Sequence, residues 1–157
     1  PALVALDATM VIRSIAGERT VPAQDYFVGP ANDIENTTVL RPGEILTAVR
    51  IPATWANATF YFEKVADRNV WDFSLVNVAA AFKVSGGMIE DSRIVVGAVQ
   101  ATPRRVTAVE NAIRGQAKNA VTADSVATLA TTGARALAHN GFKIPLMQNL
   151  VKRAISA

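Results

Sequence analysis

The first fifty residues alternate short apolar runs with polar turns, a pattern typical of β-strands. Leu3–Leu6 and Thr9–Ile15 are aliphatic and β-branched, and Ile45–Ile51 is another such run that ends before Pro52. Residues 29–42 between them are rich in Pro, Asn, Asp and Thr, which predicts a long loop. Because this part contains no amphipathic helix pattern, we expect strands that close no core by themselves.

The residues from about 55 onward predict a compact α+β unit that begins with a three-stranded antiparallel sheet. Thr59–Val65 alternates in the period of a strand, and Phe73–Val84 is a long, mostly apolar run. After the turn Ser85-Gly86-Gly87, Met88–Gln100 forms a second long run. Two long strands around such a turn favour an antiparallel hairpin that is buried on at least one face.

Three helical patterns complete the chain and predict a three-helix bundle against this sheet. The first begins at the cap pair Thr102-Pro103 and ends at Gly115. The second begins at Thr122 and continues to Leu137, before Asn140-Gly141. The third begins at Pro145, and its apolar positions recur at helical spacing.

Composition and charge exclude several classes of function. Half of the residues are apolar and the net charge is only +3, with Arg104–Arg105 and Lys152–Arg153 as the longest basic groups. We interpret both pairs as solvated helix edges, so we expect no nucleic-acid partner. The absence of cysteine excludes a disulfide framework, a thiolate nucleophile and a cysteine-held iron–sulfur site within these residues.

The start of the sequence and its longest apolar runs indicate where in the cell the protein is expected. No run approaches the roughly 20 apolar residues that a membrane span needs, so no membrane partner is expected. Pro1 leads directly into strand-like sequence rather than a signal peptide, and we expect the chain to begin inside a longer polypeptide. The lack of cysteine fits a cytoplasmic location, and a periplasmic one stays open.

Familiar catalytic and metal-binding patterns are missing. The single histidine, His139, falls in the predicted last turn of the second helix, where a cation is favoured by the helix C-terminus. The acidic residues lack the spacing of metal ligands, and no glycine-rich nucleotide loop occurs. We therefore expect no catalytic residue and no metal ligand in this chain.

One segment carries candidate chemistry. Lys64 lies in a predicted strand, and the polar loop after that strand holds Asp67, Arg68, Trp71 and Asp72. A loop that combines charge with an indole between two strands is a plausible ligand-binding edge. The alternative is structural: Arg68 and Asp72 pair with each other, and Trp71 packs on the core.

The sequence resembles the flavin-binding subunit of the molybdenum hydroxylases, the xanthine, aldehyde and carbon monoxide dehydrogenase family. Residues 62–79 (FEKVADRNVWDFSLVNVA) resemble the start of its C-terminal domain, and residues 40–52 (LRPGEILTAVRIP) resemble the turn and strand before it. Residues 96–105 (VGAVQATPRR) are similar to its strand-to-helix passage. Residues 140–144 (NGFKI) are similar to the stretch before its last helix.

The resemblance implies an α+β fold in which residues 1–53 are the C-terminal part of the second FAD-binding lobe. Residues 54–157 would then be the flavoprotein C-terminal domain, with its three-stranded antiparallel sheet and three-helix bundle. It also implies cofactor-binding residues: Leu46 and Lys64 would contact FAD, and Arg68, Trp71 and Asp72 would surround the flavin. The pyrophosphate-binding glycine loops of the family have no counterpart in these residues.

The same resemblance implies a function within an assembly. Electrons from a molybdenum cofactor in a large subunit would pass through iron–sulfur clusters in a small subunit to FAD, and then to an acceptor. Two alternatives stay open: a domain that only docks partner subunits, and a small-molecule-binding module that uses residues 67–72.

Overall fold

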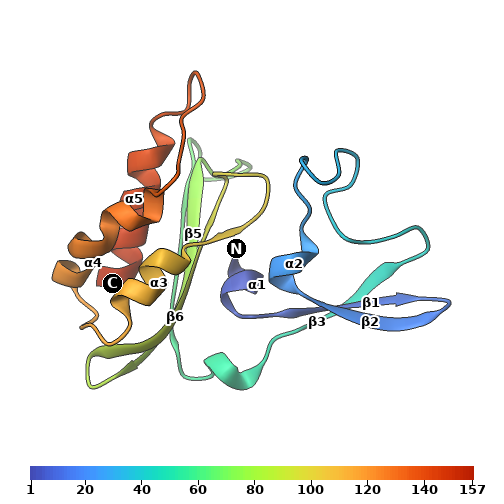
Figure 1. The fold of residues 1–157 in the computed structure, drawn as a ribbon, viewed down its shortest axis with the longest axis horizontal. Helices are drawn as coiled ribbons and strands as arrows, with labels where there is room; N and C mark the ends of the chain where they lie inside the picture. Colours follow the sequence, from blue (N-terminus) through green and yellow to red (C-terminus); the bar gives the residue numbers. More distant parts are fainter.

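A computed structural model describes residues 1–157, and its N-terminal part contains a three-stranded ribbon (Figure 1). The elements of this part are α1 (Ala2–Ala5), β1 (Thr9–Ser14), β2 (Gly17–Pro22), α2 (Ala23–Tyr26) and β3 (Ile45–Arg50). The strands are antiparallel in the order β2-β1-β3 and project away from the rest of the molecule. The strands predicted from Thr9 and from Ile45 are confirmed, as is the long loop of residues 29–42, which lies between α2 and β3.

The prediction of a strand over Leu3–Leu6 is wrong, because these residues form the helical turn α1. The backbone amide of Ala5 donates to the carbonyl of Pro1 at 2.8 Å, and that of Leu6 donates to Ala2 at 3.0 Å. Ala and Leu are strong helix formers, and proline is favoured at a helix start. The turn buries Val4 and Ala5, so apolar content alone did not distinguish it from a strand.

A bidentate ion pair ties the long loop to the ribbon. Arg19 donates through Nε and Nη2 to the two carboxylate oxygens of Glu44, both at 2.7 Å, and Nη2 also donates to the carbonyl of Val39. The amide of Arg41 donates to the same carboxylate at 2.8 Å. These bonds, those from Arg19 first, lower the pKa of Glu44 from 4.5 to about 2.

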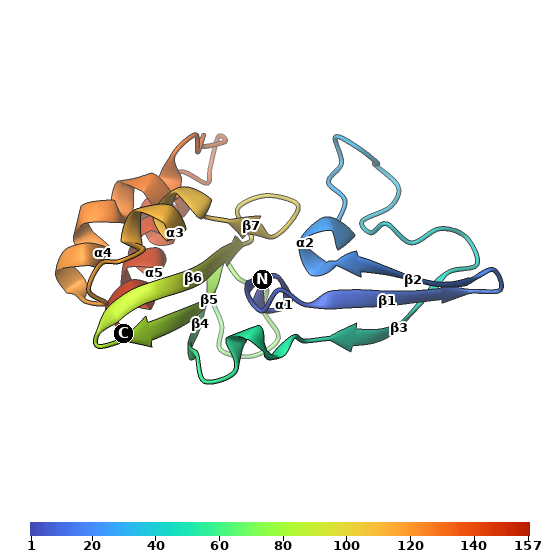
Figure 2. The same cartoon turned by 60° about the horizontal axis from the view of Figure 1, so that its bottom comes forward.

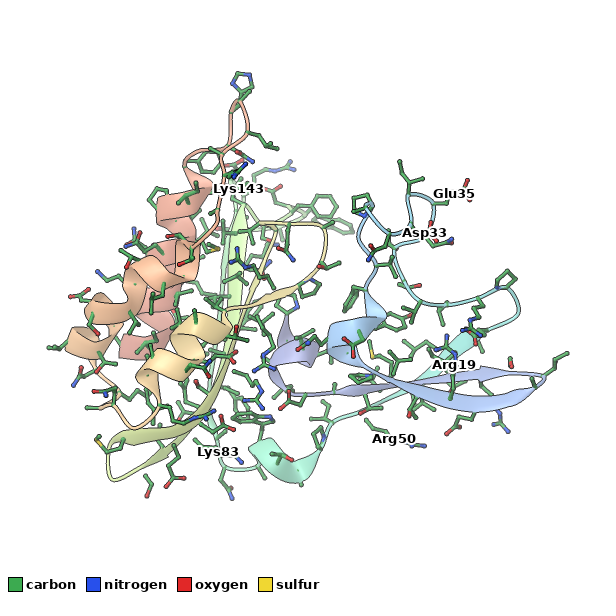
Figure 3. All side chains as sticks on the ribbon, viewed as in Figure 1. Arg19, Asp33, Glu35, Arg50, Lys83 and Lys143 are labelled. Carbon is green, nitrogen blue, oxygen red and sulfur yellow. The ribbon has the colours of Figure 1, made fainter.

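We expect the substitution Glu44→Gln to flatten the acid dependence of stability. Because the pKa of Glu44 is lower in the folded chain, its stabilisation is complete above pH 4.5 and is lost as the pH falls from 4.5 towards 2. Thermal unfolding midpoints measured across this range should therefore fall more steeply for the wild type than for the variant. Glu35→Gln, at an exposed glutamate outside the ion pairs, is the control; Figure 3 labels Arg19 and Glu35. Equal slopes for wild type and Glu44→Gln would contradict the expectation.

The C-terminal part contains a four-stranded antiparallel sheet, one strand more than predicted. Its strands are β4 (Thr59–Val65), β5 (Val76–Ser85), β6 (Met88–Gly97) and β7 (Arg104–Arg105), in the order β4-β5-β6-β7. The predicted bounds of β4 and the glycine turn between β5 and β6 are confirmed. The helix predicted from Thr102-Pro103 instead begins at Thr107, because Arg104 and Arg105 pair with β6 and Val106 donates to the carbonyl of Ile94 at 2.9 Å.

The helices cover one face of this sheet, as Figure 2 shows. They are α3 (Thr107–Ile113), α4 (Ala120–Val126), the 3-10 helix η2 (Ala127–Thr131) and α5 (Lys143–Ser156). A core of 18 buried residues lies between the helices and the sheet, and it includes Phe82, Ile94, Leu150 and Ile155. No helix combines the length and apolar character needed to cross a membrane.

The second predicted helix is shorter than expected and begins earlier. Its cap is Asn119, whose side chain accepts from the amide of Thr122 at 2.9 Å. α4 ends at Val126, and the 3-10 helix η2 continues to Thr131; two threonines and then Gly133, at φ +77°, have poor helix propensity. The loop that follows, residues 132–142, contains the exposed His139, which therefore lies outside any helix.

The opposite face of the C-terminal sheet packs against the N-terminal part. A second cluster of nine buried residues joins Val4, Met10 and Ile12 of the N-terminal part to Ala79 of β5 and Val95 of β6. The short 3-10 helix η1 (Ala53–Trp55) connects β3 to β4 and buries Trp55 at the junction. The C-terminal sheet is thus covered by helices on one face and partly covered by the N-terminal part on the other.

Candidate functional site

The candidate site lies on β4 and on the loop of residues 66–75 that joins β4 to β5. Tyr61 and Val65 of β4 pack against the 18-residue core on the helix side. Because side chains alternate along a strand, Phe60, Phe62 and Lys64 point to the other face. Both phenylalanines are more than half exposed there.

Hydrogen bonds fold the 66–75 loop around Asp72. Lys64 Nζ donates to the backbone carbonyl of Asp72 at 2.5 Å, and the amide of Arg68 donates to Asp72 Oδ2 at 2.9 Å. The Arg68 guanidinium donates to the carbonyl of Trp71 at 3.2 Å and lies 3.8 Å from Asp72 Oδ1. The Asp72 side chain is only 19% exposed, whereas that of Arg68 is 72% exposed. The predicted pairing of Arg68 with Asp72 is therefore present.

Trp71 does not pack on the core, so that part of the structural alternative is wrong. Its side chain is 96% exposed, and its φ of +54° lies in the left-handed region, which costs a non-glycine residue roughly 1–2 kcal/mol. Phe73 and Val70 are also largely exposed. An apolar loop tip held in a strained conformation is a common feature of binding sites.

Two hollows are lined by residues of β4. One, of about 430 Å³, is lined by Lys64, Val65, Ala66, Arg68 and Asn69 and contains two cations without a carboxylate. The other, of about 360 Å³, is an entirely apolar groove between α1 and the sheet. Its wall includes Phe60 and Phe62, so one strand places two aromatic rings and a lysine on the same face. A planar apolar ring with an acceptor at one end suits this arrangement.

Asn77, which the sequence analysis did not single out, belongs to the same face. It pairs with Lys64 across β4 and β5, and with Gly97 across β5 and β6. Its amide nitrogen donates to Ser74 at 2.6 Å, but its Oδ1 is buried without a partner. A Cβ at Gly97 would approach that oxygen to 2.6 Å and Pro1 Cγ to 2.7 Å, so a larger residue there would displace both side chains. A polar residue within the otherwise apolar run of residues 76–82 was the available signal.

Leu46 lies apart from the other predicted site residues, in β3 of the N-terminal sheet. It pairs with Ile12 and packs against the second cluster. That cluster also contains Ala79, the cross-strand partner of Phe62. The 66–75 loop and the adjacent end of β4 therefore hold Lys64, Arg68, Trp71 and Asp72 together. Leu46 contacts the second buried cluster from the N-terminal sheet. No group of three or more His, Asp or Glu residues is arranged to hold a metal ion.

Two family models match consecutive parts of the chain. Residues 1–54 match the FAD binding domain in molybdopterin dehydrogenase, and residues 61–157 match the CO dehydrogenase flavoprotein C-terminal domain. The glyceraldehyde dehydrogenase medium chain of Sulfolobus acidocaldarius is 36% identical over 117 residues, which cover 74% of this chain and 39% of that protein. The nicotine 6-hydroxylase medium subunit of Paenarthrobacter nicotinovorans is 31% identical over 160 residues, with 98% of this chain and 53% of that protein covered.

Solved structures have the same arrangement of elements. Quinoline 2-oxidoreductase from Pseudomonas putida 86 superposes with a TM-score of 0.83 at 31% identity, over 98% of this chain and 52% of that one. Carbon monoxide dehydrogenase from Hydrogenophaga pseudoflava superposes with a TM-score of 0.84 at 28% identity, over 98% and 53%. The chain thus spans about half the length of the relatives that it matches along its whole sequence.

Proposed function

The chain belongs to the family of FAD-binding subunits of the molybdenum hydroxylases, and from this premise we propose that it completes the flavin site of such an oxidoreductase. In this proposal residues 1–53 finish the second FAD-binding lobe, and residues 54–157 form the C-terminal domain that closes over the flavin. The observation that carries the proposal is the shared face of β4 and β5, where Lys64 and the unpartnered oxygen of Asn77 stand next to apolar surface.

Lys64 and Asn77 fit the polar edge of a flavin ring, which presents both hydrogen-bond acceptors and an N–H donor. The Lys64 ammonium has no carboxylate partner and spends one of its three donors on the carbonyl of Asp72. It would donate to an acceptor of the ring and, as a fixed positive charge, favour the anionic reduced form. Asn77 Oδ1 would accept a hydrogen bond from the N–H of the ring, which would satisfy a buried acceptor.

The loop and the aromatic strand face would control what reaches the cofactor. Asp72 holds Lys64 through its carbonyl and holds Arg68 through its carboxylate, so it positions both cations. Phe60, Phe62 and Trp71 would exclude water from the ring, and Leu46 would approach it from β3. FAD supplies the chemistry when bound: it takes up electrons and passes them to an acceptor.

The partners in this proposal are a large subunit with the molybdenum cofactor and a small subunit with iron–sulfur clusters. Support comes from relatives named as medium chains or medium subunits of a glyceraldehyde dehydrogenase and a nicotine 6-hydroxylase. A further relative is the CO dehydrogenase medium chain of Hydrogenophaga pseudoflava. Electrons would enter the flavin from the iron–sulfur clusters, and no residue of this chain would break a substrate bond.

The substitution Lys64→Gln tests the proposal in the flavin subunit of the assembled complex. We expect it to weaken FAD binding about tenfold, because one charge-assisted hydrogen bond is lost. FAD affinity is measured by removing the flavin and titrating it back while its fluorescence is recorded. Lys152→Gln, on α5 at the helix-covered side of the sheet, is the matched control and should keep wild-type affinity.

The second candidate function, docking of partner subunits without cofactor contacts, is favoured by the exposure of Val70, Trp71 and Phe73. It predicts a different result for Lys64→Gln and an effect of Trp71→Ser on assembly. Lys64→Gln would then leave the FAD affinity unchanged, whereas Trp71→Ser would lower the yield of assembled complex in gel filtration. That combination would overturn the assignment of Lys64 to the flavin.

A further inference from the structure

A basic pocket lies where the 132–142 loop meets the segment after β6 and the start of α5. Its volume is about 190 Å³, and Gln100, Arg104, Arg135, Asn140 and Lys143 provide its polar lining. No aspartate or glutamate lines it. Figure 3 labels Lys143 at this end of α5. Three cations from three separate segments therefore converge on one small hollow.

These cations lack acidic partners, although pairing is common elsewhere in the chain. Nine ion pairs are present, and none involves Arg104, Arg135 or Lys143. Arg105, the next residue after Arg104, does pair, with the buried Glu110. Like charges that share a pocket repel one another, and a bound anion would relieve that repulsion.

Backbone carbonyls hold two of the cations in position. Arg104 Nη2 donates to the carbonyl of Thr132 at 3.0 Å, and Lys143 Nζ donates to the carbonyl of Ala98 at 2.9 Å. Each contact uses one donor and leaves others free, since a guanidinium has five N–H groups and an ammonium has three. The Oδ1 of Asn140 accepts a hydrogen bond from the amide of Leu137 at 2.6 Å. The NH₂ group of Asn140 is therefore available as an additional donor.

We propose that this basic pocket binds the phosphate group of a small ligand. Guanidinium groups match tetrahedral oxyanions through paired hydrogen bonds, and the positive end of the α5 dipole adds to the attraction. A volume of 190 Å³ is below the roughly 300 Å³ at which pockets begin to enclose drug-sized molecules. The pocket therefore takes inorganic phosphate or the phosphate end of a larger molecule. None of the residues that line it is among the proposed flavin contacts.

Calorimetric titration of the 157-residue chain with inorganic phosphate, at constant ionic strength in chloride, tests the proposal. We expect saturable binding that Arg135→Gln weakens about tenfold, because a charged hydrogen-bonding pair is removed. Arg135 is exposed on a loop, so its replacement leaves the core intact. Arg13→Gln removes the same charge from an exposed position on β1 and should keep wild-type affinity. Backbone amide shifts at Gly133 and Asn140 should follow the same titration.

Further titrations identify the source of the phosphate. If AMP binds more tightly than phosphate while adenosine does not bind, the ligand is a nucleotide; equal affinities for AMP and phosphate indicate free phosphate. Three results would overturn the proposal: no saturable binding, equal losses in Arg135→Gln and Arg13→Gln, or acetate binding as tight as phosphate. The last would assign the pocket to a carboxylate, such as an acidic side chain of a partner.

Discussion

Replacing Glu110 with alanine is expected to lower the free energy of unfolding by about 3 to 5 kcal/mol, because it leaves a partly buried charge without its partner. Glu110 is 4% exposed and accepts three hydrogen bonds. Its donors are the amide of Ile94 at 2.9 Å and two guanidinium nitrogens of Arg105, the shorter contact at 2.5 Å. One carboxylate thus joins α3 to both β6 and β7.

Urea denaturation measures this effect, and two further variants separate its causes. Glu110→Gln keeps an oxygen for the amide of Ile94 and loses the charge, so it should lie between wild type and Glu110→Ala. Glu90→Ala removes an exposed carboxylate from β6 and should change stability by less than about 0.5 kcal/mol. Similar losses in Glu90→Ala and Glu110→Ala would show that the buried contacts contribute little.

The second large effect is expected at Trp55, where alanine should cost about 3 to 5 kcal/mol. Trp55 is 2% exposed, and its indole N–H donates to Asp7 at 2.9 Å. Arg93 lies over the ring at 5.1 Å and also pairs with Asp7 at 3.2 Å. The indole therefore links α1 and β1 to β6, and its loss should loosen the N-terminal part more than the helix-covered core.

Hydrogen exchange resolves that difference, because it reports each strand separately. Amides of β1 should lose more protection than amides of β5 in Trp55→Ala. Trp71→Ala is the matched control: it removes the same side chain from an exposed loop and should change stability by less than about 0.5 kcal/mol. Uniform loss of protection across both sheets would contradict a local linking role.

The elements that the sequence predicted well are those with clear periodicity. Thr59–Val65 has the predicted bounds because its residues alternate between the core and an exposed face. The family resemblance is confirmed by both family models. The predictions failed where tertiary contacts decided the structure. Arg104 and Arg105 were interpreted as a helix edge, but they form β7 because the edge of β6 was open to pairing.

In the candidate site, too, local contacts were predictable from the sequence and tertiary contacts were not. Lys64, Arg68 and Asp72 are within eight residues of one another, so a local loop was enough to predict that they meet. The unpartnered oxygen of Asn77 and the close fit at Gly97 depend on the register of three strands. The basic pocket joins residues from β7, the 132–142 loop and α5, and no sequence pattern predicts that convergence.

The second cluster has a consequence for the order in which the chain folds during synthesis. Met10 and Ile12 leave the ribosome before Ala79 and Val95, which are among the residues that cover them. At roughly 5 to 20 residues per second, the N-terminal ribbon waits several seconds with its apolar face uncovered. The hairpin of β5 and β6 pairs residues that are close in the sequence, which favours its rapid formation. The ribbon thus docks onto a sheet that has already formed, although the ribbon is made before that sheet.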